Sequence, residues 1–214
     1  MVDAIKFLID FVLHIDKHLF EIVSKYETWT YLILFLIVFA ETGLVVTPIL
    51  PGDSLLFAAG AIAGSSGGLD IFYLMFILFI AVFAGDNTNY FIGNYIGPKV
   101  FEKNYRLLKR EYLEQTRTFY AKHGGKAIIM ARFVPIVRTF APFVAGVGSM
   151  TYKRFIGFSL LGSLLWINIC LWAGYFFGGL PFVKENFSLV VLVIIAISVL
   201  PIIIGIIRNR SRKE

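Results

Sequence analysis

The sequence predicts an all-α membrane protein, arranged as an inverted repeat of amphipathic helix, re-entrant hairpin and transmembrane helix, plus a C-terminal transmembrane helix. Of its 214 residues, 58% are hydrophobic and 16% are charged, and the mean hydropathy is +0.78. A soluble domain keeps roughly a quarter of its residues charged. Two apolar blocks, Phe155–Val183 and Phe187–Ile207, carry no charge over the length of roughly 20 residues with which a helix crosses a bilayer.

The first segment, residues 1–28, is predicted to be an amphipathic helix in the membrane interface. Apolar residues recur at helical spacing over residues 3–26, with acidic and lysine side chains between them. This mixture is typical of a helix that lies on a membrane rather than across it. The segment has no basic stretch ahead of a short apolar core and a small-residue cleavage site, so we expect no cleaved signal peptide.

The second segment, residues 29–66, is predicted to be a re-entrant hairpin. Its first apolar stretch is too short to cross a bilayer before it reaches Glu41. The tip, which ends at Asp53, contains three residues that break helices: Pro48, Pro51 and Gly52. Because broken backbone is tolerated at membrane depth only inside protein or beside a water-filled cavity, we expect the hairpin to be buried in the protein.

The next segments repeat this order. Ile71–Gly97 is predicted to be a transmembrane helix that carries Asp86 and Asn87 in its second half. The basic stretch 98–126 is predicted to be a second amphipathic helix. Residues 126–150 then form a second broken apolar hairpin, which contains Arg132, Pro135, Arg138 and Pro142.

The two halves of the chain therefore share one pattern. A single membrane crossing separates corresponding points of the halves, so the halves must have opposite orientations in the membrane. Inverted repeats whose broken helices meet near the bilayer midplane are typical of transporters, which bind substrate at the repeat interface. We expect one membrane domain over residues 29–180. Residues 181–214 should form the last transmembrane helix and a basic tail.

Basic residues predict the orientation. The stretch 98–126 and the tail, with Arg208 to Lys213, should lie in the cytoplasm, which places the C-terminus there. The side of the N-terminus stays open. The net charge of +6 is explained in the same way, by cytoplasmic loops and anionic leaflets, and nothing in its distribution predicts a nucleic-acid partner.

Five charged side chains lie inside the predicted membrane segments and form the candidate site: Glu41, Asp53, Asp86, Arg132 and Arg138. Each costs about 2.5–3.5 kcal/mol to insert, so they should face the interior and pair. In a structural interpretation, they only neutralise each other and hold the hairpins together. In a functional interpretation, the arginines bind phosphate oxygens, which match the planar guanidinium. The carboxylates then exchange protons, because a low-dielectric cavity favours their neutral form.

The functional interpretation gives each residue a role. Glu41 and Asp53 would couple transport to protons, and Arg132 and Arg138 would bind the phosphate headgroup. Asp86 is a supporting residue, which either has a functional role or only satisfies freed amides at a hairpin tip. The remaining supporting residues are Asn87, Pro48, Pro51, Gly52, Pro135 and Pro142.

Other chemistry is not indicated. The sequence contains no nucleotide-binding loop, nucleophile elbow or zinc motif, so we expect no enzyme, no cofactor and no metal site. His14 and His18 are four residues apart, but the charges around them favour a solvated interfacial pair. Cys170 is the only cysteine and is expected to be an inert buried thiol.

Two long motifs resemble the bacterial DedA family. They are FAETGLVVTPILPGDSLL at residues 39–56 and ARFVPIVRTFAPFVAG at residues 131–146. The stretches GDNTNYFIG at 85–93 and FYAKHGG at 119–125 are similar to the family as well, so the resemblance covers essentially the whole chain. The wider group includes eukaryotic lipid scramblases with the same domain, called the SNARE-associated or VTT domain.

The resemblance implies a bacterial inner-membrane protein with two facing re-entrant hairpins. It also implies lipid transport, because members recycle undecaprenyl phosphate across the membrane, several depend on the proton gradient, and members are linked to envelope integrity. The family's functional acid pair falls on Glu41 and Asp53, and its arginine pair on Arg132 and Arg138.

We therefore expect a flippase that moves undecaprenyl phosphate or a related anionic lipid, with the lipid and protons as its partners. The alternatives are a broad phospholipid scramblase, a proton-coupled ion antiporter and a purely structural or assembly role. The lipid, the coupling ion, the direction of transport and the formation of a homo-oligomer stay open.

Overall fold

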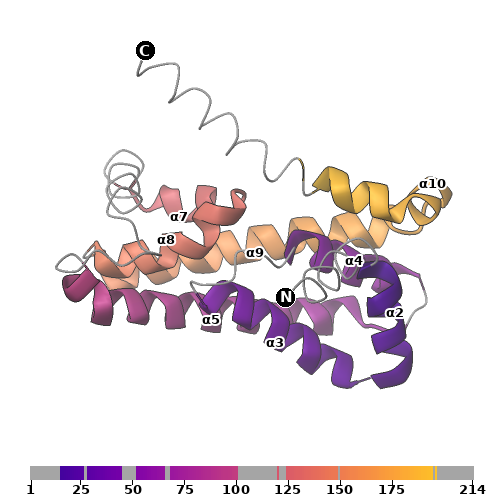
Figure 1. Ribbon diagram of the computed structural model, residues 1–214, viewed down its shortest axis with the longest axis horizontal. Helices are drawn as coiled ribbons and strands as arrows, with labels where there is room; N and C mark the ends of the chain where they lie inside the picture. The colour runs from indigo at the N-terminus through magenta and orange to yellow at the C-terminus, as the bar shows by residue number, and fades with distance from the viewer. Residues whose placement is uncertain are drawn as a thin grey trace, which may run out of the picture. The chain divides into compact units, whose positions relative to one another are not determined.

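The computed structural model describes residues 15–26, 28–44, 52–65, 68–100, 120, 124–148, 150–194 and 196. Within these ranges all regular structure is helical (Figure 1), which confirms the predicted all-α class. The helices are α2 Ile15–Tyr26, α3 Trp29–Gly43, α4 Gly52–Gly64, α5 Ile71–Val100, α7 Lys126–Ala131, α8 Pro135–Val147, α9 Tyr152–Phe177 and α10 Pro181–Glu185.

Helices α5 and α9 are long and apolar enough to cross a membrane. The candidate spans are Ile71–Ile96 and Tyr152–Phe177, each with a mean hydropathy of 1.8 and only 39% of its most apolar window buried. Large exposed side chains such as Phe76 and Ile169 cover the remaining surface, as expected of helices that face lipid. They correspond to the predicted transmembrane helices at 71–97 and 155–177. The predicted helix at 187–207 is helical over 187–194, and most of its remainder lies outside the described residues.

Both predicted hairpin segments contain two short helices with a break between them. In the first, α3 and α4 flank a tip whose prolines, Pro48 and Pro51, lie outside the described residues. In the second, α7 ends before Arg132, Val134 is extended, and Pro135 opens α8, a position that suits proline because its missing N–H has no helical partner there. Pro142 lies inside α8. The re-entrant course and the inverted repeat remain predictions.

The chain divides into two compact units, each described by itself. The first unit comprises Met1–Phe35, Ile49–Leu78 and Ile167–Glu214, and the second comprises Leu36–Pro48 and Phe79–Trp166.

In the first unit, α4 packs closely against the C-terminal half of α9. A Cβ atom at Gly60 would overlap the backbone of Leu171, and one at Gly174 would overlap the backbone of Phe57. The glycines thus bring the two backbones together, as small residues do in membrane helix pairs. Helix α2 also packs on α4 in this unit, and its buried residues include Leu19 and Val23. The amphipathic character predicted there is present, while its place in the interface remains a prediction.

In the second unit, α5 and α8 approach just as closely. A Cβ atom at Gly93 would overlap the carbonyl oxygen of Phe143, and one at Gly146 would overlap that of Tyr90. The Tyr90 ring stacks on Phe155 with the ring centroids 4.4 Å apart, and its hydroxyl donates to the Met150 carbonyl at 2.6 Å. This packing positions the polar residues of α5 and α8 next to one another.

Candidate functional site

Four buried charges lie together in the second unit. Glu41, Asp86, Arg132 and Arg138 are each at most 5% exposed. They form two ion pairs, one between Arg138 Nη2 and Glu41 Oε1 at 2.5 Å and one between Arg132 Nη2 and Asp86 Oδ2. Each arginine of the second predicted hairpin is therefore neutralised by its own carboxylate.

The pair of Glu41 and Arg138 joins the end of α3 to the first turns of α8. Trp166 of α9 supports it, because the Arg138 guanidinium carbon lies 4.6 Å from the centroid of the buried Trp166 ring. A guanidinium stacks favourably on an aromatic face while its edge keeps hydrogen-bonding. The geometry therefore fixes the plane of the Arg138 side chain and leaves its edge toward the carboxylate.

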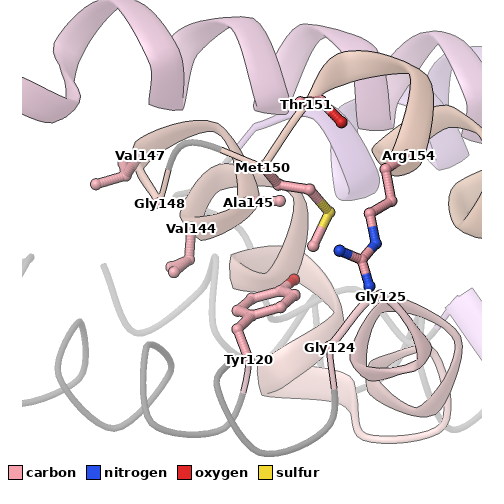
Figure 2. Close-up of a pocket in the computed structure, with 10 residues that line it drawn as sticks. All are labelled: Tyr120, Gly124, Gly125, Val144, Ala145, Val147, Gly148, Met150, Thr151 and Arg154. Carbon is pink, nitrogen blue, oxygen red and sulfur yellow. The ribbon is translucent and has the colours of Figure 1, made fainter.

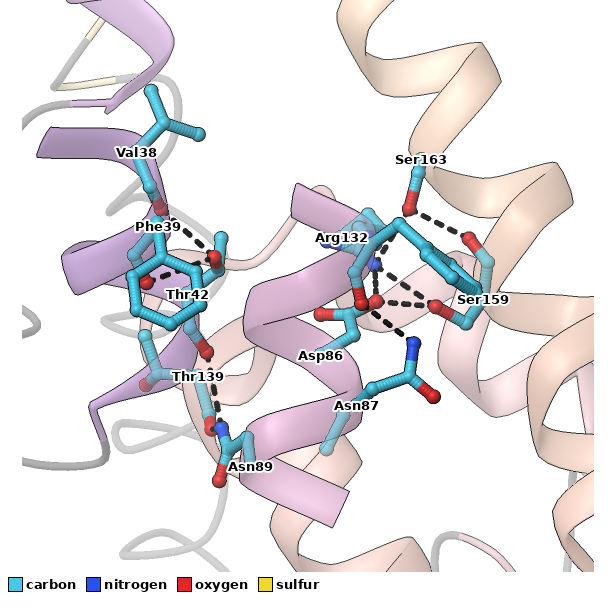
Figure 3. Close-up of polar contacts among 12 residues, drawn as sticks. Val38, Phe39, Thr42, Asp86, Asn87, Asn89, Arg132, Thr139, Ser159 and Ser163 are labelled. Atoms are coloured by element: carbon cyan, nitrogen blue, oxygen red, sulfur yellow. Dashed lines mark hydrogen bonds and ion pairs between the residues drawn. The ribbon is translucent and has the colours of Figure 1, made fainter. Parts of the chain in front are cut away.

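The pair of Asp86 and Arg132 belongs to a hydrogen-bond network with two serines of α9 (Figure 3). Ser159 donates to the same Asp86 oxygen that binds Arg132. Arg132 Nη2 donates to Ser163 Oγ at 2.9 Å, and Ser163 donates to the Ser159 carbonyl at 2.7 Å. Asp86 is thus a direct partner of a site arginine, a closer role than the supporting one that its sequence position indicated.

The two serines were not predicted from the sequence. Both are fully buried, and they stand four residues apart in the part of α9 that follows Arg154 and carries no charge. Residues at this spacing share one helix face, so a pair of hydroxyls in this uncharged stretch was the available signal.

Asn89 is a polar residue of α5 to which the sequence analysis assigned no role. Its buried amide nitrogen donates to the Thr139 carbonyl at 2.6 Å and to the Thr42 carbonyl at 3.2 Å. It therefore links α5 to α8 and to the end of α3, the elements that carry the ion pairs (Figure 3). Asn87, the predicted supporting amide, is half-buried and bonds to the Phe83 carbonyl of its own helix.

Near these pairs, the buried atoms Arg132 Nη1 and Asn89 Oδ1 have no hydrogen-bond partner among the described residues. Leaving a buried donor or acceptor unsatisfied costs about 1–3 kcal/mol. A water molecule or a ligand oxygen at Arg132 Nη1 would recover part of that cost. Arg132 Nη1 is therefore a buried donor with room for a further acceptor.

The fifth predicted charge belongs to the first unit. Asp53 is half-buried in the first turn of α4, directly after the buried Gly52. A carboxylate in this position is stabilised by the positive end of the helix dipole. The described residues bring no three His, Cys, Asp or Glu side chains close enough together to hold a metal ion.

Comparisons with known proteins agree with the motifs. Residues 50–176 match the VTT domain. The chain is 54% identical over 210 residues to Protein DedA of Escherichia coli K12, an alignment that covers 97% of this chain and 96% of the relative. It is 43% identical over 184 residues to an uncharacterized membrane protein of Mycobacterium tuberculosis H37Rv, which covers 85% of this chain and 81% of the relative.

A further relative is named for its location. Inner membrane protein YghB of Escherichia coli K12 is 32% identical over 178 residues, which cover 83% of this chain and 78% of the relative. No solved structure matches this chain.

Proposed function

We propose that this chain, which belongs to the DedA family of membrane proteins, moves undecaprenyl phosphate or a related anionic lipid across the bacterial inner membrane by proton-coupled transport. The observation that carries the proposal is the buried group of two arginines, each paired with a carboxylate, with Arg132 Nη1 left for a further acceptor. The relatives that are named as inner membrane proteins support the location.

Phosphate recognition rests on the arginines. A guanidinium binds phosphate through two parallel charge-assisted hydrogen bonds. Arg132 already offers Nη1, while Arg138 would have to release Glu41 to offer more of its edge. A lipid phosphate therefore competes with the carboxylates for the same donors.

This competition supports proton coupling. When a carboxylate takes up a proton, it loses the charge that holds its arginine, and the arginine becomes available to the phosphate. When the phosphate leaves, the arginine again favours the ionised carboxylate, and the proton is released. Glu41 acts in this way on Arg138, and Asp86 acts on Arg132. Asp53 keeps the proton-exchanging role proposed from its motif.

A liposome assay tests the proposal. Reconstituted protein should move undecaprenyl phosphate between leaflets faster with a pH gradient than without one, and faster than ordinary phospholipids. Equal movement of all lipids without a gradient would indicate a scramblase instead. Cation-dependent proton flux without any lipid would indicate an antiporter.

Paired variants separate function from structural support. Arg138→Gln alone leaves the Glu41 charge buried, so its effect mixes folding with transport. Glu41→Gln with Arg138→Gln removes both charges, and we expect it to fold but not to transport. Lys184→Gln, an exposed change in α10, is the matched control. A double variant that transports normally would show that this pair is structural.

A further inference from the structure

The second unit contains a cavity that the ion pairs do not use. Its volume is about 610 Å³, within the range of small-ligand sites. It lies between Tyr120, the start of α7, the end of α8 and the start of α9 (Figure 2). None of the buried charged residues described above lines it.

One wall of the cavity is apolar. Val144 and Val147 of α8 and the Met150 side chain that follows them form it, and Figure 2 shows the Met150 thioether directed toward Arg154 across the space. Tyr120 closes another side, since its hydroxyl donates to the Ala141 carbonyl at 2.7 Å. Burial raises the pKa of Tyr120. The phenol therefore stays neutral and brings no negative charge that would repel a bound anion.

The opposite wall carries a positive charge. Arg154 of α9 lies on the cavity with its side chain exposed. Gly124 adopts a left-handed backbone with φ +59°, a conformation that favours glycine. A Cβ atom at this position would lie 3.5 Å from Arg154 Nη2, so this backbone turn lies beside the guanidinium. None of the described lining residues is acidic, so within this wall the arginine has no carboxylate.

The position of Arg154 indicates what kind of ligand fits. It is in the first turn of α9, whose apolar length makes it a candidate membrane span from Tyr152 onward. The end of such a helix lies where hydrocarbon meets the polar headgroups. The start of a long helix adds partial positive charge beside the guanidinium. A cavity at this level with one cationic and one apolar wall suits a molecule with an anionic head and an apolar tail.

We propose that this cavity binds the phosphate group of an anionic amphiphile, with the phosphate on Arg154 and the first carbons of the tail on Val144, Val147 and Met150. It is an interfacial site for the lipid, distinct from the ion-pair site. The choice of a lipid phosphate as the ligand rests on the proposed function. The apolar wall and the position of Arg154 are observed independently of that function.

Binding of a short-tailed probe tests this site. Farnesyl phosphate, farnesol and inorganic phosphate are titrated by calorimetry into the full chain in phosphatidylcholine nanodiscs. We expect Arg154→Gln to weaken farnesyl phosphate binding roughly tenfold, the effect of losing a charge-assisted hydrogen bond, and Arg154→Lys to recover part of it. Lys153→Gln, an exposed neighbour that does not line the cavity, should bind like the unchanged protein.

Photo-crosslinking locates the bound probe. A diazirine-bearing farnesyl phosphate should label residues 144–154, and Arg154→Gln should reduce that labelling while thermal unfolding stays unchanged. Unchanged binding and labelling in Arg154→Gln would overturn the site. If inorganic phosphate bound as tightly as farnesyl phosphate, the tail would add nothing to binding. That result would contradict an amphiphilic ligand and identify free phosphate as the ligand.

These outcomes are separable from those of the proposed function. Loss of binding in the Glu41→Gln, Arg138→Gln double variant, with Arg154→Gln normal, would overturn this site and leave the ion-pair site standing. Labelling at residues 144–154 without any translocation of undecaprenyl phosphate would support the cavity and contradict the transport proposal.

Discussion

The two units bring their helices together in the same way, but only one of them buries charge. In the first, Gly60 of α4 and Gly174 of α9 lie against the backbone of the opposite helix, and in the second, Gly93 and Gly146 join α5 to α8. Yet all four buried charged side chains found among the described residues belong to the second unit.

This difference separates packing from function. The first unit shows that close glycine contacts join membrane helices without charge. The second unit has such contacts too, between α5 and α8, in addition to ion pairs that join α3 to α8 and α5 to the residue after α7. Replacing a buried ion pair by apolar residues is often neutral or stabilising. Four buried charges in a unit that already packs through glycine therefore favour a functional interpretation. Substitutions in each unit test this difference.

The largest effect is expected from breaking one ion pair in the second unit. Asp86→Asn removes one charge and leaves that of Arg132 buried, which should lower the free energy of unfolding by about 3–5 kcal/mol. Adding Arg132→Gln should recover most of that loss without restoring transport. Unfolding in mixed detergent micelles measures both, with the exposed Glu185→Gln as the control. An Asp86→Asn protein as stable as the unchanged one would contradict a buried charged pair.

A smaller loss is expected from crowding the helix contact of the first unit. Gly174→Ala places a methyl group against the Phe57 carbonyl and should cost about 1–3 kcal/mol. Gly157→Ala is the matched control in the same helix, because no atom lies within 4 Å of its new methyl group. That variant should gain up to about 1 kcal/mol from helix propensity. The same unfolding assay compares them, and equal stabilities would argue against the close contact.

The smallest effect is expected from the serine that supports Arg132. Ser163→Ala removes one hydrogen bond to Arg132 Nη2 but leaves the Asp86 pair in place. We expect a loss of about 1 kcal/mol and a slower, still proton-dependent transport. Ser65→Ala is the control, because it removes a hydroxyl just after α4 that donates to the Ile62 carbonyl, away from the ion pairs. If transport by the Ser163→Ala protein no longer responded to a pH gradient, Ser163 would take part in proton coupling and would not merely support Arg132.

Much of the architecture could be predicted because it depends on local pattern. Long uncharged runs of residues predict transmembrane helices, and α5 and α9 lie at the positions of two such runs. The break before α8 could be predicted from Pro135, whose ring and missing N–H place it at the start of a helix. The prolines of the first tip lie outside the described residues, so their part of the prediction is untested.

The partners within the site could not be predicted in the same way. The sequence predicted that buried acids and arginines pair, but it did not predict which acid contacts which arginine. The structure pairs Glu41 with Arg138 and Asp86 with Arg132. Like charges repel in a low-dielectric interior, whereas opposite charges offset part of each other's cost of desolvation.

Sequence alone predicted a helical membrane protein of the DedA family with five charged residues inside its membrane segments, because hydrophobic length and motif are local properties, and the structure buries four of the five. Only the tertiary structure decided which acid neutralises which arginine, that Ser159, Ser163 and Asn89 complete the network, and that Arg154 faces an apolar wall. The hydrogen bonds that connect the two arginines, Asp86 and Asn89 to other elements join residues that are 27 to 97 positions apart. Nothing in a one-dimensional pattern specifies such distances, because they depend on how closely the glycine-packed helices approach.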